Sequence, residues 1–472
     1  MRPGLRSLAI AVICWLHLVA AVPGCRAQQG RLLLGGRVVT GSGTAEHGWL
    51  ELQNGRIIRI YTEKPEFSDA PMLDTDDFIF PGFIDLHNHP TYNIFPRWTP
   101  PRKYPNRYAW RDSEEYKQVI ERPAAKVLVS ENFCDVDEYV EVKALIGGTT
   151  SIIGISAARP ATATKAAVVT PDCVKGLVRN LDSYTGFYGD EPDHERIVNS
   201  IGILPRDMNT TRAADIVRGI DSGSVDLLAI HIAEGLPTDA ESQSELDALD
   251  THHLLTAHTV LVHSVGLSHS QFARVQRAQA AIVWSPHSNL VLYGATANVD
   301  AAFRSGVGIA LAPDWSPSGS DNMLDEIKYA SGVSRDKLGG LFSNRQLVEM
   351  ASAVPARIAR IDDKVGTLAA GQYADFFLLN APADAANPYD ALVQADVTGV
   401  ELVVVNGVPL YGSPEKLEAL HIPSEALEVC GQQRALNRSA LPAGPFAQVE
   451  QRLRIKMKAA GVELAPLAEC VK

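Results

Sequence analysis

Between residues 78 and 365 the chain alternates short apolar segments, typical of buried strands, with longer segments typical of helices. This alternation predicts a parallel sheet, because parallel neighbours need a crossover connection between them. The expected strands are residues 78–86, 149–155, 177–181, 200–204, 225–230, 260–262, 281–284 and 307–312. Eight strands are what a (β/α)8 barrel requires, so we predict an α/β fold with a TIM barrel at residues 78–365.

Two strand-rich flanks, residues 31–77 and 366–412, bracket the expected barrel. They predict one small β-sandwich domain formed from both chain ends, with a hairpin turn at Asn54-Gly55. Residues 413–472 are expected to be a C-terminal extension.

An insertion at residues 90–139, rich in proline, arginine and aromatic residues, follows the first expected strand. Active sites of such barrels form at the carboxyl ends of the strands, so the insertion lies where it can cover a pocket. A structural arm or a dimer contact is the alternative interpretation.

Residues 1–27 have the pattern of a bacterial secretory signal, in which Arg2 and Arg6 precede a short apolar stretch and a small-residue cleavage region. We therefore expect an exported protein, either released into the periplasm or anchored to the bacterial envelope. The anchor would be a lipid on Cys25, whose surroundings resemble a lipobox, and this lipid is the one membrane contact that we expect.

Four cysteines, Cys134, Cys173, Cys430 and Cys470, remain after the signal segment. An oxidising compartment permits the pairs Cys430–Cys470 and Cys134–Cys173, although isolated buried thiols fit the sequence equally well. The net charge is −12 and no lysine or arginine run occurs after the signal segment, which excludes an electrostatic nucleic-acid surface. The expected partner is a small-molecule substrate.

Residues able to bind a metal ion or transfer a proton follow the ends of several expected strands. His87 and His89 close the first strand and point to the same face, because side chains two apart on a strand share a face. His231, His263 and Asp314 lie at the ends of three later strands, and Glu234 follows His231 in the loop. Strand ends of a parallel barrel converge, so these side chains are expected to meet.

This ordered set resembles the amidohydrolase superfamily. The resemblance rests on the run from Pro81 to His89, on His231 with Glu234, on the strand that ends in His263 and on Asp314. Residues 284–290 are similar to the seventh-strand loop of the deaminase and chlorohydrolase branch, and residues 366–376 are similar to the family's return into its β-domain.

The resemblance implies a metal site with His87, His89, His231 and Asp314 as ligands. Three neutral imidazoles and one carboxylate that leave a position open for water suit Zn²⁺, with Fe²⁺ as the alternative. The resemblance also implies that Asp314 takes a proton from the water and that Glu234 passes one to the leaving nitrogen. His263 is expected to orient the nucleophile and polarise the attacked carbon.

Family members with two metal ions carry a carboxylated lysine or a glutamate on the fourth strand. The segment expected there, residues 199–205, contains neither residue. The sequence therefore favours a single divalent metal ion.

Other residues are secondary candidates for the pocket. His287 lies in the seventh-strand loop, where Asn289 is expected to hold the loop geometry, and Trp98 and Arg107 of the insertion could meet the substrate. Residues 315–320 either shape the pocket floor or form a purely structural tight loop.

The expected activity is hydrolysis of a carbon–nitrogen bond other than a peptide bond, with deamination of a cyclic amidine or related heterocycle as the first candidate. Amide or lactam hydrolysis by the same residues is the second candidate. A lipoprotein that binds a ligand without turnover is the third.

Overall fold

The computed structural model describes residues 31–470 apart from 41–44, 67–69, 156–175, 183–195, 201, 205, 206, 381, 383, 384 and 386. The expected signal segment, Cys25 and Cys173 lie outside the described residues, so export and lipid attachment stay predictions. Among the described helices, none combines the length and the apolar character that a membrane crossing requires.

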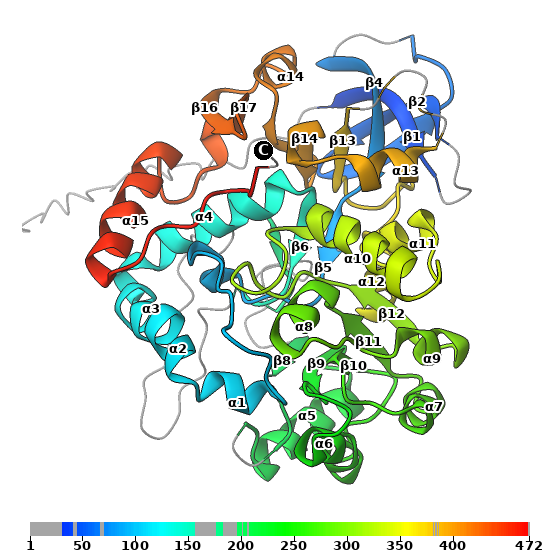
Figure 1. Cartoon of the computed structure of the whole chain (residues 1–472). Coiled ribbons are helices and arrows are strands. Elements are labelled where there is room, and N and C mark those ends of the chain that lie inside the picture. Colours follow the sequence, from blue (N-terminus) through cyan, green and yellow to red (C-terminus); the bar gives the residue numbers. More distant parts are fainter. Residues whose placement is uncertain are drawn as a thin grey trace, which may run out of the picture.

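Eight parallel strands form two sheets, one ordered β12-β11-β10-β9-β8 and the other β5-β6-β7 (Figure 1). Their bounds are β5 Phe83–Asp85, β6 Thr149–Ile152, β7 Arg179–Asn180, β8 Ile197–Ser200, β9 Leu227–Ile232, β10 Thr259–His263, β11 Ala281–Trp284 and β12 Gly308–Leu311. An isolated parallel bridge between Asn88 and Asp314 connects the segments that follow β5 and β12. The α/β architecture with parallel strands agrees with the expectation from the sequence.

Helices occupy the crossovers. Those between β8 and β12 are α5 Thr210–Ser222, α6 Ala240–Thr251, α7 His269–Arg277, α8 Pro286–Tyr293 and α9 Val299–Arg304. The insertion and its continuation to β6 contain α1 Arg107–Arg111, α2 Glu114–Tyr116, α3 Arg122–Val127 and α4 Phe133–Ile146. After β12 follow α10 Met323–Lys337, α11 Asn344–Glu349, α12 Ala353–Ile358, α13 Pro388–Gln394, α14 Pro414–Ala419 and α15 Phe446–Ala460.

A separate β-rich part contains strands from both ends of the described chain in one nine-stranded sheet, ordered β16-β17-β15-β14-β13-β4-β1-β2-β3 (Figure 1). Its strands are β1 Leu32–Val39, β2 Ala45–Gln53, β3 Arg56–Tyr61, β4 Met72–Pro81, β13 Phe376–Leu379, β14 Val400–Val405, β15 Val408–Gly412, β16 Ser424–Val429 and β17 Gln432–Asn437. Asn54 and Gly55 both have positive φ and form the expected hairpin turn. The sheet includes β16 and β17 of the C-terminal extension, beyond residue 412.

The apolar run at residues 78–86, expected to be one strand, is divided between the two parts of the fold. β4 pairs with β13 in the nine-stranded sheet, whereas β5 pairs with β6 in a parallel sheet. The division lies at Gly82, where a Cβ atom would lie 2.1 Å from Thr150 Oγ1. Only glycine allows the chain to pass this close to β6, so the single-strand prediction was wrong at this point.

The fourth strand was also predicted in the wrong place. β8 spans Ile197–Ser200 and pairs with β9 from Ile197 opposite Leu227, whereas the sequence favoured residues 200–204. Beyond the strand, the Leu204 carbonyl accepts from the amides of Asp207 and Met208. β8 contains neither lysine nor glutamate, so the argument for a single metal ion is unchanged.

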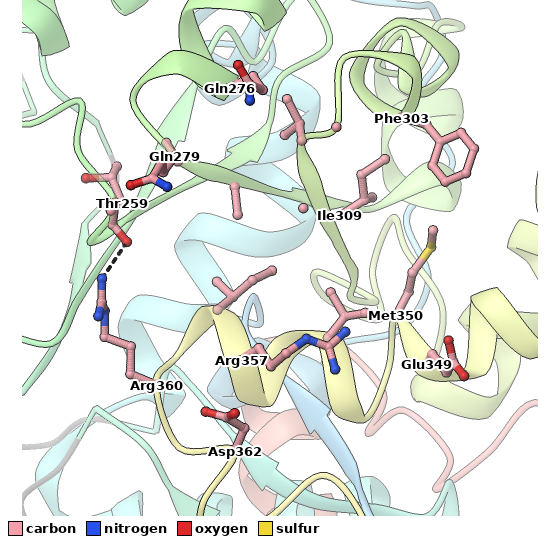
Figure 2. A pocket seen from close by; sticks show the side chains of 18 of the residues that line it. Thr259, Gln276, Gln279, Phe303, Ile309, Glu349, Met350, Arg357, Arg360 and Asp362 are labelled. Carbon is pink, nitrogen blue, oxygen red and sulfur yellow. Dashed lines mark hydrogen bonds between the residues drawn. The ribbon is translucent and has the colours of Figure 1, made fainter. Parts of the chain in front are cut away.

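A groove of about 1090 Å³ opens at the amino ends of the parallel strands (Figure 2). Thr259, Ala281 and Gly308, the first residues of β10, β11 and β12, line it together with Arg360, whose guanidinium donates to the Ala257 carbonyl. This is the end opposite to the candidate ligands, so the groove is separate from them.

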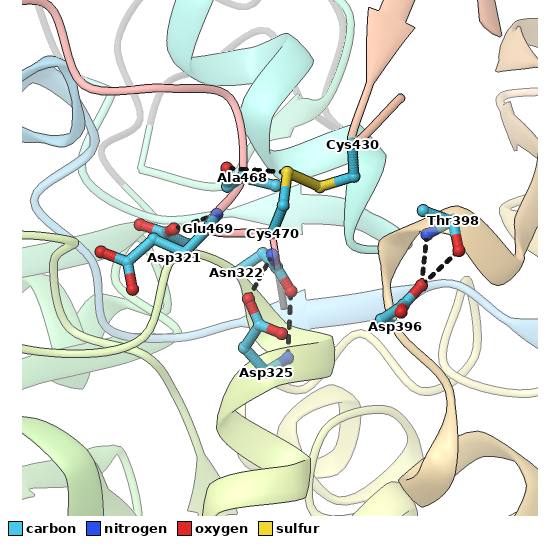
Figure 3. The surroundings of a disulfide bond; sticks show 9 residues. All are labelled: Asp321, Asn322, Asp325, Asp396, Thr398, Cys430, Ala468, Glu469 and Cys470. Carbon is cyan, nitrogen blue, oxygen red and sulfur yellow. Dashed lines mark hydrogen bonds between the residues drawn. A yellow bond between two sulfur atoms is a disulfide. The ribbon is translucent and has the colours of Figure 1, made fainter. Parts of the chain in front are cut away.

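The C-terminal segment is fastened by a disulfide between Cys430 and Cys470 (Figure 3). Cys430 lies in the turn between β16 and β17, and the neighbouring Glu469 amide donates to Asp321 Oδ2 at 2.9 Å. Asp321 belongs to the loop that follows β12, so the chain end bridges the nine-stranded sheet and the parallel sheets.

Replacing Cys430 with serine is expected to lower the free energy of unfolding by about 2–4 kcal/mol, because the bond closes a long loop. Chemical denaturation of the oxidised wild type and the oxidised C430S variant measures the difference. Under a strong reductant the two proteins should unfold at the same denaturant concentration. Equal stability of the two oxidised proteins would contradict the prediction.

Candidate metal centre

Six side chains selected from the sequence lie at the carboxyl ends of neighbouring strands. They are His87 and His89 after β5, His231 in β9, Glu234 after β9, His263 at the end of β10 and Asp314 after β12. Backbone hydrogen bonds join the first and last segments, because the His89 amide donates to the Asp314 carbonyl at 2.8 Å and the Asp314 amide donates to the His87 carbonyl at 3.2 Å. The structure therefore brings all six predicted residues together.

The nitrogen and oxygen atoms of four of these side chains face one another. His87 Nε2 lies 3.2 Å from His231 Nε2 and 3.3 Å from Asp314 Oδ1. His89 Nε2 lies 3.6 Å from the same Asp314 oxygen. Ligands of a tetrahedral zinc ion at ordinary bond lengths are separated by about 3.4 Å. Among the described residues, three groups have ligand atoms within 4.8 Å of one another: His87, His89 and His231; His87, His263 and Asp314; and His231, Glu234 and His263.

Hydrogen bonds behind the imidazoles fix their tautomers. His231 Nδ1 lies 3.1 Å from the Ser200 carbonyl at the end of β8, and His263 Nδ1 lies 2.9 Å from Asn289 Oδ1 in α8. A carbonyl oxygen only accepts, so both Nδ1 atoms carry the proton and both Nε2 atoms present a lone pair to the centre. His87 Nδ1 makes a similar contact with Ser285 Oγ at 3.3 Å.

The electrostatic environment keeps these imidazoles neutral. Burial, reinforced by the neighbouring histidines, lowers the pKa of His87 and His231, and it lowers the pKa of His89 to about 4. Neutral imidazole is the form that binds a metal ion. Burial raises the pKa of Asp314 despite a 2.5 Å hydrogen bond from Ser288 Oγ, and a bound cation would counter this by favouring the carboxylate. The donor set therefore fits a divalent metal ion.

Glu234 lies beside this group and is held by a chain of hydrogen bonds. Its Oε1 accepts from the Tyr293 hydroxyl at 2.6 Å and lies 3.7 Å from His263 Nε2. Trp110 of the insertion donates its indole N–H to the Tyr293 oxygen at 2.8 Å. Burial raises the pKa of Tyr293, so its hydroxyl keeps the proton that it donates to the carboxylate.

Four residues at this edge have left-handed backbone conformations that non-glycine residues rarely adopt. The φ angles are 52° at Ala233, 68° at His263, 54° at Ser264 and 71° at Asp314. Such conformations cost free energy and persist where the surrounding structure enforces them, often at functional sites. Here they occur where the chain must turn a strand end so that a candidate side chain faces the centre.

A cavity of about 170 Å³ opens directly above the candidate ligands. Its walls are aromatic, and Trp315 has ring contacts with Tyr92, Trp110 and Tyr116 at centroid distances of 5.7–6.3 Å. A second cavity of about 490 Å³ shares Tyr92, Arg111 and Tyr116 with the first. We call these the inner chamber and the outer cavity.

The secondary candidates are placed differently from one another. Arg107 lines the inner chamber, but its guanidinium is buried and paired with Asp207 at 2.9 Å. Trp98 does not line either cavity and packs against Trp110 and Tyr116 instead. His287 stacks on Tyr329 and contacts Ser320, so it lies outside the chamber lining.

Several residues of the site were not singled out as pocket residues from the sequence. Tyr293 is the last residue of α8, and Trp110 and Arg111 end α1. No strand-end position or motif marks these residues, and only the aromatic and basic composition of the insertion gave a general signal. Trp315 does line the chamber, as one of the two interpretations of residues 315–320 expected.

Comparison with known proteins places these observations in a family. The amidohydrolase family matches residues 226–410. A probable guanine deaminase of Schizosaccharomyces pombe is 27% identical over 150 residues, which are 30% of this chain and 28% of the relative. A 5-methylthioadenosine/S-adenosylhomocysteine deaminase of Caldanaerobacter subterraneus is 25% identical over 236 residues, 47% of this chain and 53% of the relative. The chain thus spans about half or less of the length of these relatives.

Solved structures share the fold over a longer range. An adenosine deaminase from Xanthomonas campestris with bound zinc has a TM-score of 0.64 at 18% identity, covering 90% of this chain and 98% of that one. A triazine hydrolase variant has a TM-score of 0.64 at 16% identity and covers 80% and 94%. The matched family region supports the resemblance that the motifs indicated, and the solved structures share the fold. Residues 226–410 thus belong to the amidohydrolase family by sequence, and the relatives that match this chain include deaminases.

Proposed function

We propose that this protein hydrolyses a carbon–nitrogen bond other than a peptide bond, with one divalent metal ion, and that it deaminates a cyclic amidine or related heterocycle. The observation that carries the proposal is the convergence of His87, His89, His231 and Asp314 beside Glu234. The names of the relatives, deaminases of guanine and of methylthioadenosine, support an amino-substituted ring as substrate.

The architecture that we infer for this function is a closed (β/α)8 barrel. The Asn88–Asp314 bridge supports closure between the first and last strands, and the similarity to the solved structures supports it independently. Closure would hold His87 and His89, which follow the first strand, at a fixed separation from Asp314, which follows the last.

His87, His89, His231 and Asp314 would hold the metal ion, Zn²⁺ or alternatively Fe²⁺, which when bound polarises water and lowers its pKa toward neutrality. Ser288 donates to Asp314 Oδ2, and Oδ1, which faces the imidazoles, is the oxygen that would bind the metal ion. The Asp314 carboxylate would also accept the proton that the attacking water releases. His263 donates through Nδ1 to Asn289, and its Nε2 therefore accepts a hydrogen bond and orients the water. This geometry favours the orienting role of His263 over polarisation of the carbon.

Glu234 is the residue that we assign to proton transfer toward the leaving nitrogen. Tyr293 holds Oε1, which positions the carboxylate at the edge of the inner chamber. A carboxylate in this place can take the proton that Asp314 or the water releases and deliver it to the nitrogen of the substrate.

The aromatic walls of the inner chamber favour a flat ring over a flexible amide, which is why deamination precedes amide or lactam hydrolysis among the candidates. The test is to offer the zinc-loaded protein heterocyclic amines, lactams and linear amides while ammonia release and ring opening are measured. Ammonia from the ring amines supports deamination, and ring opening supports the lactam alternative. Bound metal without turnover on any class would favour a binding protein and overturn the proposal.

Replacing His231 with alanine is expected to abolish hydrolysis and reduce bound metal well below one ion per chain, because the substitution removes one of four proposed ligands. Elemental analysis of the purified variant and ammonia release measure both effects. The matched control is H269A, which removes an exposed histidine at the start of α7. Full turnover of H231A would exclude the proposed site.

Replacing Glu234 with glutamine is expected to lower kcat by about 10²–10⁴-fold, because the amide cannot carry the proton. Metal content should stay at the wild-type value, since Glu234 is not among the proposed ligands. Steady-state kinetics together with elemental analysis check the prediction, and E131Q, at an exposed position of the insertion, is the control. An unchanged kcat would remove Glu234 from the mechanism.

Replacing Tyr293 with phenylalanine is expected to lower kcat by about tenfold with little change in KM, because Glu234 loses a charge-assisted hydrogen bond. The control is Y104F, which deletes a buried hydroxyl that has no hydrogen-bond partner among the described residues. Equal losses of kcat in Y293F and Y104F would show that removal of a buried hydroxyl, and not loss of the contact with Glu234, causes the effect.

A further inference from the structure

We propose that the substrate carries a carboxylate beside its reacting ring and that Arg111 binds this carboxylate where the inner chamber meets the outer cavity. The inference rests on the proposed function and narrows its substrate class. Four features of Arg111 and its surroundings support the inference.

The inner chamber is small. Its volume of about 170 Å³ lies below the roughly 300–1,000 Å³ of pockets that enclose whole drug-sized ligands. The chamber therefore has room for the reacting ring against Trp110 and Trp315, and substituents of the ring must extend outward. The direction open to them is the outer cavity, which shares residues with the chamber.

Arg111 belongs to the lining of both cavities. It lines them together with Tyr92 and Tyr116, so it lies where the two cavities adjoin. A substituent that extends from the inner chamber toward the outer cavity would therefore come close to Arg111.

Arg111 is incompletely paired. Among the described residues it is paired with Asp207, whose Oδ1 lies 3.5 Å from Nη1, beyond the usual 2.7–3.2 Å of a hydrogen bond. The other oxygen of Asp207 accepts from Arg107 at 2.9 Å and from the Tyr108 hydroxyl at 2.8 Å. Arg111 thus competes with two closer donors for one carboxylate.

Substrate binding would desolvate the Arg111 guanidinium. The Arg111 side chain is 39% exposed, and a substrate that fills the space where the two cavities adjoin would take its N–H groups out of water. An uncharged substituent would leave these donors unsatisfied, at a cost in binding free energy. A carboxylate matches the fork of the guanidinium with two charge-assisted hydrogen bonds.

Other charged groups of the outer cavity are consistent with this assignment. Lys117 donates to the Asp112 backbone carbonyl, and the side chains of Asp112 and Glu121 belong to the outer cavity but not to the inner chamber. An anion therefore finds its complementary charge where the two cavities adjoin, beside Arg111, and meets acidic groups farther out.

Equilibrium binding to the zinc-loaded protein tests the assignment without turnover, using nicotinate and nicotinamide as probes that share a ring and differ in charge. Quenching of tryptophan fluorescence reports binding, because Trp110 and Trp315 line the chamber. The wild type should bind nicotinate at least tenfold more tightly than nicotinamide. In R111Q this preference should fall to within about threefold, and R111K should give an intermediate value.

Kinetics test the same point on substrates. For amino-substituted pyrimidines or purines offered as carboxylate and as carboxamide, R111Q should raise KM for the carboxylate by about 10–100-fold and leave the carboxamide nearly unchanged. The control R102Q removes another arginine of the insertion, which stacks on Tyr104 outside both cavities.

A nicotinate preference that persists in R111Q, or that disappears in K117Q instead, would overturn the assignment of the carboxylate to Arg111. Failure of the proposed function has a different signature. In that case no ring amine releases ammonia, while the binding preference for nicotinate still depends on Arg111.

Discussion

Two backbone hydrogen bonds between the segments after β5 and β12 underlie the whole site, because they join His87 and His89 to Asp314 before any metal ion is considered. Parallel strands bring their carboxyl ends to one edge, and the bridge fixes the first and last of them relative to each other. His231 and His263 then need only strand register to reach the same point. The site is therefore a consequence of topology more than of local sequence.

The sequence predicts best the features that follow from the spacing of apolar residues and from the position of a polar residue at a strand end. Buried strands such as β9 and β10 are near-continuous apolar segments, and the histidine at or next to the end of each stands out against that background. His231 and His263 could be selected for this reason. Likewise α15 begins at Phe446 and ends before Gly461, whose φ of 91° is typical of the glycine that follows a helix.

The parts that it predicts poorly depend on contacts between distant segments. Gly82 divides an apolar run because Thr150 lies against it, and Gly202 admits the Arg107 guanidinium, since a Cβ atom there would lie 2.2 Å from Nη2. Neither neighbour is visible in the local sequence. Tyr293 and Arg111 were missed for the same reason, because their importance comes from Glu234 and from two adjoining cavities lined by a remote insertion.

Chemistry and recognition come from different parts of the chain in this arrangement. The candidate ligands and Glu234 belong to strand ends, whereas Trp110, Arg111 and Tyr116 belong to the insertion. The two sets meet where Trp110 donates to Tyr293, which in turn holds Glu234. A ring that packs against Trp110 would therefore contact a residue that donates to Tyr293, the hydrogen-bond partner of Glu234, which we propose to carry the proton. Substrate preference can change through the insertion without disturbing the ligands, provided that this one hydrogen-bond chain is kept.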